Sequence, residues 1–143
     1  MNEPVWVTEE DCLSFNDKLL ARFGGASGVR DKGLLLSALA RPQHVFAYEK
    51  PSLFDLAAAY AHGIVKNHPF IDGNKRSGFL AAALFLEANG MRFTGDERDA
   101  VIQTLALAAG ESTLQDFSTW LQRVSVQPPS EPTDAPLHDR DAS

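Results

Sequence analysis

The chain has 143 residues, 44% of them hydrophobic, a formal net charge of −6 and one cysteine. This length can bury one hydrophobic core but does not divide comfortably into two. The single cysteine excludes an internal disulfide, and the acidic balance argues against a general nucleic-acid binder, which needs clustered Lys and Arg.

No segment of the sequence is suited to crossing a membrane. The longest apolar run lies near residues 81–86 and falls far short of the roughly 20 residues that a membrane span needs. The first residues also lack the basic-then-apolar pattern of a signal peptide. We therefore expect a cytoplasmic protein that binds neither a membrane nor nucleic acid directly.

Apolar residues recur every three to four positions along most of the chain, which predicts an all-α fold. Thr8 and Asp11 match a capping box, and they predict a first helix that runs to about Phe23, where two glycines follow. A short second helix is expected at about residues 31–41, because Pro42 should end it.

The third predicted helix precedes a histidine and a proline. Ser52 and Asp55 match a second capping box, followed by a helical pattern over residues 56–67. A residue before proline resists the helical conformation, so the helix should stop at Pro69. This places His68 at a helix end.

A fourth helix is predicted at about residues 74–89, with Gly90 as its left-handed terminator. Because it is apolar on most faces, it should lie at the centre of a helical bundle. Two further helices are expected, one at about residues 96–109 and one from the capping residue Thr113 to about Val124.

Short runs at residues 5–7 and 91–94 could form strands, although neither is long enough for a sheet core. From residue 127 onward the chain is rich in proline and poor in apolar residues, which predicts a disordered tail. The expected organisation is one domain at residues 1–126 and a tail at residues 127–143.

The run His-Pro-Phe-Ile-Asp-Gly-Asn-Lys-Arg at residues 68–76 contains the parts of a phosphate site. Gly73 permits a sharp turn that directs backbone N–H groups inward as the fourth helix begins. Asn74 can cap that helix or donate to an oxygen, while Lys75 and Arg76 supply cations suited to phosphate oxygens.

The other residues of this run predict a metal-assisted reaction. Asp72 beside a phosphate would be repelled unless a cation such as Mg²⁺ lay between them. His68, fixed by Pro69, can accept a proton from an attacking hydroxyl, because an imidazole is the side chain that exchanges protons most readily near neutral pH. Phe70 is expected to be a buried anchor that holds the loop in shape.

This run resembles the signature of the Fic/Doc superfamily in its Doc (death-on-curing) form, in which Lys75 takes the place of a glycine found in Fic adenylyltransferases. Residues 28–42 also resemble the Doc segment upstream of the signature, and residues 81–90 resemble the helix downstream of it. The resemblance covers most of residues 8–122.

The resemblance implies an all-helical Fic fold and the toxin of a type II toxin–antitoxin pair, with ATP and Mg²⁺ as donor and metal. It implies transfer of the γ-phosphate to a hydroxyl of elongation factor Tu, which would inhibit translation. His68 would then be the base and Asp72 the metal-associated carboxylate. Gly73, Asn74, Lys75 and Arg76 would hold the phosphates, with Pro69 and Phe70 supporting the loop.

Two features of the sequence differ from the pattern of the Fic/Doc superfamily. Leu36 stands where the family often has Glu, and the chain lacks the inhibitory Ser/Thr-x-x-x-Glu run that many Fic enzymes carry. Inhibition is therefore expected to come from a separate antitoxin, whose acidic or amphipathic segment would dock near the active site.

Three other functions remain open at this stage. The same site could transfer AMP or another nucleotide to a protein, or the chain could be an inactive module that only binds an antitoxin. A metal phosphohydrolase that uses His62, His68 and Asp72 is the third alternative, although His62 is more typical of a core or interface histidine.

Overall fold

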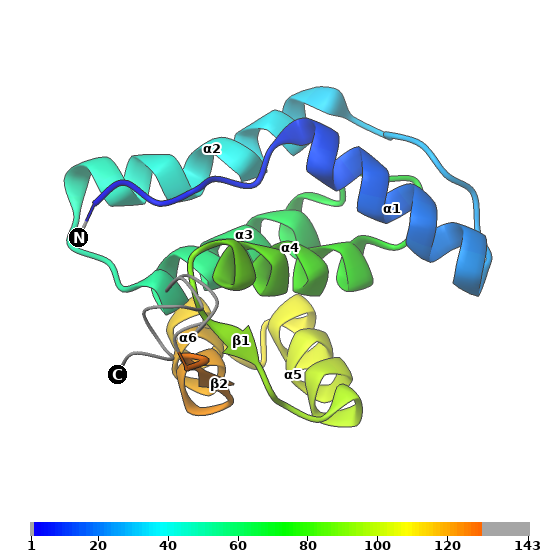
Figure 1. Ribbon diagram of the computed structural model, residues 1–143. Helices are drawn as coiled ribbons and strands as arrows, with labels where there is room; N and C mark the ends of the chain where they lie inside the picture. Colours follow the sequence, from blue (N-terminus) through cyan, green and yellow to red (C-terminus); the bar gives the residue numbers. More distant parts are fainter. Residues whose placement is uncertain (1, 130–143) are drawn as a thin grey trace, which may run out of the picture.

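The computed structural model describes residues 2–129, which form six helices and one two-stranded antiparallel sheet (Figure 1). The all-α prediction is therefore confirmed. The elements in chain order are α1 (Glu9–Phe23), α2 (Lys32–Tyr48), α3 (Leu53–Asn67), α4 (Asn74–Ala88), β1 (Arg92–Phe93), α5 (Glu97–Ala109), α6 (Leu114–Arg123) and β2 (Ser125–Val126).

The helices lie in three layers, with α3 and α4 side by side in the middle (Figure 1). α1 and α2 cover one side of this pair, and α5 and α6 cover the other. The central pair packs closely because Gly78 faces α3: a Cβ there would lie 2.8 Å from Cγ1 of Val65. α4 is central as predicted, and its partner α3 is more completely buried.

The predicted helix starts agree well with the structure. Capping boxes are present at the three expected N-caps, which are Thr8, Ser52 and Thr113. The third helix begins at Leu53, three residues earlier than the predicted start, because Ser52 itself is the N-cap. Local side-chain chemistry therefore determines where these helices begin.

The prediction that α2 ends before Pro42 is wrong, because the helix continues to Tyr48 with Pro42 inside it. A proline inside a helix costs about 3 kcal/mol or more. The additional turns pack Val45 and Phe46 against the core, and the Phe46 ring meets Trp6 edge to face at a centroid distance of 5.6 Å. This tertiary burial offsets the local penalty.

The strand predictions are corrected in two places. Residues 5–7 form no strand, since the Asn89 side chain binds the N–H and C=O groups of Val5 and the Tyr60 hydroxyl accepts from the Val7 N–H. At residues 91–94 only β1 forms, and it pairs with β2, which the sequence did not indicate.

Most of the predicted disordered tail lies outside the described residues. Residues 127–129 are described and belong to no helix or strand. Within residues 2–129, none of the helices combines the length and apolar character that a membrane span requires.

Candidate functional site: the turn into α4

The turn that begins α4 leaves its backbone amides free. Gly73 is the N-cap in the left-handed conformation, with φ +79°, and no side chain within residues 2–129 caps the helix. Among the described residues, no hydrogen-bond acceptor lies opposite the N–H groups of Gly73, Asn74, Lys75 or Arg76. Unpaired amides at the positive end of a helix dipole form a binding site for an anion.

Glycine is required at position 73 for two reasons. Its positive φ is strained for other residues, and a Cβ there would lie 3.0 Å from Cδ1 of Leu19 on α1. The turn therefore depends on close packing against α1 as well as on backbone freedom.

His68 projects its side chain away from the core, at the opposite end of the loop. It is the C-cap of α3 with φ +51° and ψ +54°, the left-handed region that non-glycine residues rarely adopt. Its carbonyl accepts from Nε of Arg30 at 2.7 Å, while its exposed imidazole has no hydrogen-bond partner among the described residues. The ring is therefore free to exchange a proton with a bound substrate.

The segment between His68 and Asp72 is held by the linker that joins α1 to α2. The Pro69 carbonyl accepts from the N–H groups of Arg30 and Asp31, and the Ile71 N–H donates to the Gly28 carbonyl. Phe70 between them is 1% exposed and belongs to the hydrophobic core. Both ends of the loop are thus fixed before any ligand binds.

The Asn74 side chain points into the loop rather than toward a ligand. Its Oδ1 accepts from the Phe70 N–H at 2.9 Å, and its Nδ2 donates to the Phe70 carbonyl at 3.0 Å. Because this buried side chain is fully used by Phe70, Asn74 can reach a phosphate only through its backbone N–H.

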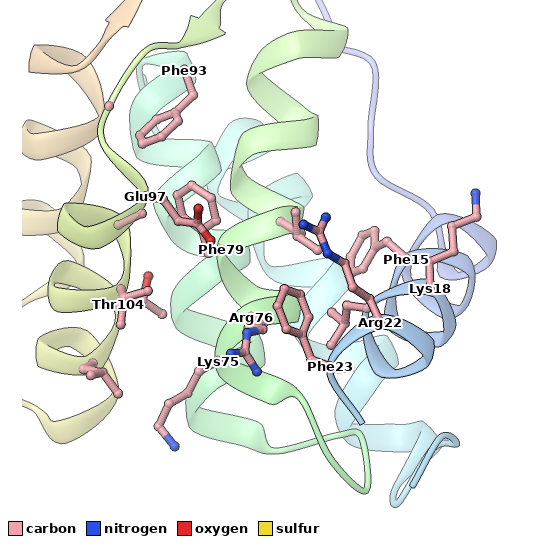
Figure 2. A pocket seen from close by; sticks show the side chains of 16 residues that line it. Phe15, Lys18, Arg22, Phe23, Lys75, Arg76, Phe79, Phe93, Glu97 and Thr104 are labelled. Carbon is pink, nitrogen blue, oxygen red and sulfur yellow. The ribbon is translucent and has the colours of Figure 1, made fainter. Parts of the chain in front are cut away.

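Lys75 and Arg76 lie at the mouth of a cavity of about 690 Å³ between α1, α4 and α5 (Figure 2). The guanidinium of Arg76 lies 4.2 Å from the centroid of the Phe23 ring, a cation–π contact. Lys75 also lines a second hollow of about 490 Å³ that His68 lines too. One cationic side chain therefore connects the large cavity with the imidazole.

The cavity itself is cationic on the side of α1 and α4 and mainly apolar inside (Figure 2). Lys18 and Arg22 add two cations from α1, and Phe79 and Phe93 supply aromatic walls. Thr104 on α5 is 4% exposed, and its hydroxyl has no partner within the described residues. A ligand with an anionic end and a flat apolar part would match this lining.

Asp72 has the features of a carboxylate that could bind a cation with substrate phosphates. Its Oδ2 accepts from the Ala26 N–H at 2.7 Å, while no hydrogen bond or ion pair occupies its Oδ1 in the part of the chain that the structure describes. Mg²⁺ is typically held by one or two carboxylates, phosphates and water, so this set fits it.

The structure does not assemble the metal cluster of the phosphohydrolase hypothesis. Residues 2–129 contain no group of three or more His, Cys, Asp or Glu side chains that could hold a metal ion. His62 is half-buried on α3, where burial and the charges of Lys66 and Arg41 lower its pKa below 6.5. The charges of Lys66 and Arg41 would also repel a metal ion at His62, so residues 2–129 do not support this hypothesis.

Three residues that support the site were not among the site residues predicted from the sequence. Asn16 on α1 is buried and donates from Nδ2 to the Asp72 carbonyl and to the Ser77 hydroxyl. Ala26 binds the Asp72 carboxylate, and Arg30 binds the carbonyls of the last turn of α3. Asn16 alone had a signal in the sequence, because it is a polar residue at a position that the apolar period of α1 places on the buried face.

Comparisons with known proteins identify the family of this chain. A model of the Fic/DOC family matches residues 6–86. The chain is 47% identical over 95 residues to Toxin Doc of Mycolicibacterium smegmatis, an alignment covering 64% of this chain and 69% of that protein. It is 30% identical over 119 residues to Protein kinase doc of Escherichia phage P1, covering 82% and 94% respectively. The chain therefore belongs to the Fic/DOC family.

Proposed function

We propose that this protein is a Doc-type toxin that transfers the γ-phosphate of ATP to a hydroxyl group of another protein. The single observation that carries the proposal is the uncapped start of α4, with Lys75 and Arg76 in its first turn and the free imidazole of His68 nearby. The names of the two relatives, a toxin and a protein kinase, support the same function.

The proposed reaction uses residues of this chain for positioning, charge and proton transfer. The acceptor hydroxyl gives its proton to an imidazole nitrogen of His68 as its oxygen bonds to the γ-phosphorus. The bond from that phosphorus to the bridging oxygen breaks, and ADP leaves. The amides of residues 73–76, with Lys75 and Arg76, stabilise the charge on the phosphoryl oxygens. Mg²⁺, when bound at Asp72, would neutralise part of the phosphate charge.

The large cavity is suited to the nucleoside part of the donor. Its volume of about 690 Å³ is within the range of small-molecule sites, and its aromatic walls offer surfaces on which a base can stack. Its cationic mouth adjoins the start of α4, so a phosphate chain can extend from one to the other. ATP is thus the donor that this lining supports.

Two further functions use the same geometry. AMP transfer would need the α-phosphate, rather than the γ-phosphate, to lie beside His68. The second is an inactive module that only binds an antitoxin. The free amides and the solvent-facing imidazole favour an active transferase, because a pure binding module has no need for either.

We further propose that a cognate type II antitoxin inhibits the protein by covering the cavity. Three apolar side chains on α5, which are Val101, Ile102 and Leu105, are 48–52% exposed and line the two hollows. Lys18 and Arg22 stand on the opposite wall of the larger one. An acidic amphipathic segment would complement both surfaces.

Purified protein incubated with Mg²⁺ and ATP labelled at either the α- or the γ-phosphate tests the proposal. Elongation factor Tu, the proposed acceptor, and other bacterial translation factors serve as acceptors. We expect transfer of the γ-label, reduced about 10²- to 10⁴-fold in His68→Ala. His44→Ala is the matched control, because His44 is exposed on α2 and lines neither hollow.

The outcomes separate the functions. Transfer of the α-label would establish nucleotidylation in place of phosphorylation. Absence of both labels on every acceptor, with tight binding to the antitoxin, would leave only the binding module. Expression in a bacterial host gives a second test: growth should stop with the wild-type chain, continue with His68→Ala, and recover when the antitoxin is co-expressed.

A further inference from the structure

The linker between α1 and α2 contacts the catalytic loop along its length. Besides the backbone pairing of Val29 with Phe70, the Ala26 N–H donates to Oδ2 of Asp72 at 2.7 Å. This distance is at the short end of the range for N–H···O bonds, as expected for a bond to an ionised carboxylate. A segment that is distant in sequence therefore contacts the one carboxylate of the proposed metal site.

Asp72 is held from two sides by different elements. Its backbone carbonyl accepts from Nδ2 of Asn16 on α1, and its side chain accepts from Ala26 in the linker. Because Oδ2 is used, Oδ1 is the carboxylate oxygen without a described protein partner. The Ala26 N–H thus selects which oxygen remains available.

Gly25 allows this contact by having no side chain. A Cβ at Gly25 would lie 3.0 Å from Cδ2 of Leu20 and 3.3 Å from both Cβ and Oδ2 of Asp72. Its φ of +119° is also a conformation that other residues rarely adopt. A side chain at position 25 would therefore displace either the linker or the carboxylate.

We infer that Gly25 and Ala26 are positioning residues for Asp72, which fix its carboxylate so that Oδ1 is presented to a divalent cation. The inference rests on the proposed function, because that proposal places the divalent cation at Asp72. Partners that orient a metal-binding carboxylate raise metal affinity, because the ligand then loses less freedom on binding. Gly25 and Ala26 act through Asp72 and do not themselves contact the substrate.

The test replaces the peptide N–H at position 26 by an ester oxygen, with lactic acid in place of Ala26. This change removes one donor and keeps the side chain. The matched control is an ester in place of the Ser27 amide, because the Ser27 N–H has no acceptor among the described residues. The readouts are the Mn²⁺ dissociation constant by electron paramagnetic resonance, with a non-hydrolysable ATP analogue, and the Mg²⁺ dependence of transfer.

We expect the ester at position 26 to weaken Mn²⁺ binding about 10-fold. The Mg²⁺ concentration for half-maximal transfer should rise by a similar factor, while kcat at saturating Mg²⁺ stays the same. The ester at position 27 should match the wild type. Adding Asp72→Asn to the position-26 ester should weaken binding no further than Asp72→Asn alone, because both changes act through one carboxylate.

Equal Mn²⁺ constants for the two esters would overturn the inference, as would a loss of kcat with unchanged metal dependence. If the position-26 ester fails to fold by circular dichroism, Gly25→Ala provides the same test with a side-chain change. Should Mn²⁺ binding change as expected while no acceptor is labelled, the positioning role stands and the proposed function fails. If an acceptor is labelled but the two esters have equal Mn²⁺ dissociation constants, the proposed function stands and the positioning role fails.

Discussion

The start of α4 differs from the starts of the other five helices. The N-caps of α1, α2, α3, α5 and α6 each accept a hydrogen bond from the first turn through a Thr, Ser or Asp side chain. α4 begins instead at Gly73, and no side chain of the described residues caps it. Lys75 and Arg76 occupy that turn, where the helix dipole disfavours cations.

We interpret the start of α4 as a helix end that binds an anion, whereas the side-chain caps of the other helices stabilise those helices. Glycine in place of a capping side chain costs a helix about a few tenths of a kcal/mol, and cations near the N-terminus add to the cost. The burial of α4 against α3 offsets this loss, so the end can remain open. An anion at this position would satisfy both the amides and the two cations.

Among the variants that test this comparison of helix starts, the largest effect is expected from Asn74→Ala, which removes both hydrogen bonds to the Phe70 backbone. A buried N–H without an acceptor costs about 1–3 kcal/mol, and loss of loop geometry should lower transfer roughly 10²-fold. Urea unfolding and the rate of γ-label transfer measure the two effects.

Asn89→Ala is the matched control at the other end of α4. Its side chain makes three hydrogen bonds, to both backbone groups of Val5 and to the Phe85 carbonyl, away from the site. It should lower stability and leave the rate unchanged. An equal loss of rate in both variants would show that general destabilisation, not the open helix end, explains the effect.

The second prediction concerns the anion directly. Inorganic phosphate should shift the amide NMR signals of residues 74–76, while the signals of the capped first turns of α1, α3 and α6 stay constant. Arg76→Ala should weaken phosphate binding about tenfold, because a charged hydrogen bond contributes roughly 1.5–3 kcal/mol. Arg123→Ala, in the last turn of α6, should have no effect. Shifts at the capped ends would contradict the comparison.

The third prediction concerns the removal of the side-chain cap from α6. Thr113→Ala removes the side chain that accepts from the Asp116 N–H at 3.0 Å, and we expect a loss of about 1 kcal/mol of stability. Thr113→Ser, which keeps the hydroxyl, should recover most of it. Neither variant should gain phosphate binding, because α6 has no basic residue in its first turn. Phosphate binding by Thr113→Ala would mean that an uncapped end alone makes the site.

The smallest expected effect is a pH dependence at the cap of α3. Burial acts to raise the pKa of Asp55, but hydrogen bonds from Ser118 and Ser52 outweigh it and hold the pKa below 3.8. The ionised carboxylate therefore adds stability above pH 3.8, which is lost as the pH falls through the folded-state pKa.

In Asp55→Asn, the free energy of unfolding should fall less steeply below pH 3.8 than in the wild type. Chemical denaturation at a series of pH values measures the slope. Asp17→Asn should follow the wild type, since Asp17 is exposed and makes no side-chain hydrogen bond in the described part of the chain. If Asp55→Asn has the wild-type slope, the cap does not couple stability to pH.

Much of the fold could be predicted from local patterns. The capping boxes at Thr8, Ser52 and Thr113 gave three helix starts, and the apolar period gave the helices themselves. The end of α2 could not be predicted, because the cost of Pro42 is local while the gain from packing Phe46 on Trp6 arises between segments far apart in sequence.

The sequence alone determined which chemical groups lie together in residues 68–76, since the order of imidazole, carboxylate, glycine and cations can be read without the fold. Only the tertiary structure decided how these groups are oriented and which of their atoms stay free to bind a ligand. It turns the Asn74 side chain inward, holds Asp72 through Asn16 and Ala26, and holds the His68 carbonyl through Arg30. Except for the Asn74 bond within the loop, these bonds join residues 38–56 positions apart in sequence, and such contacts exist only after the helices have packed.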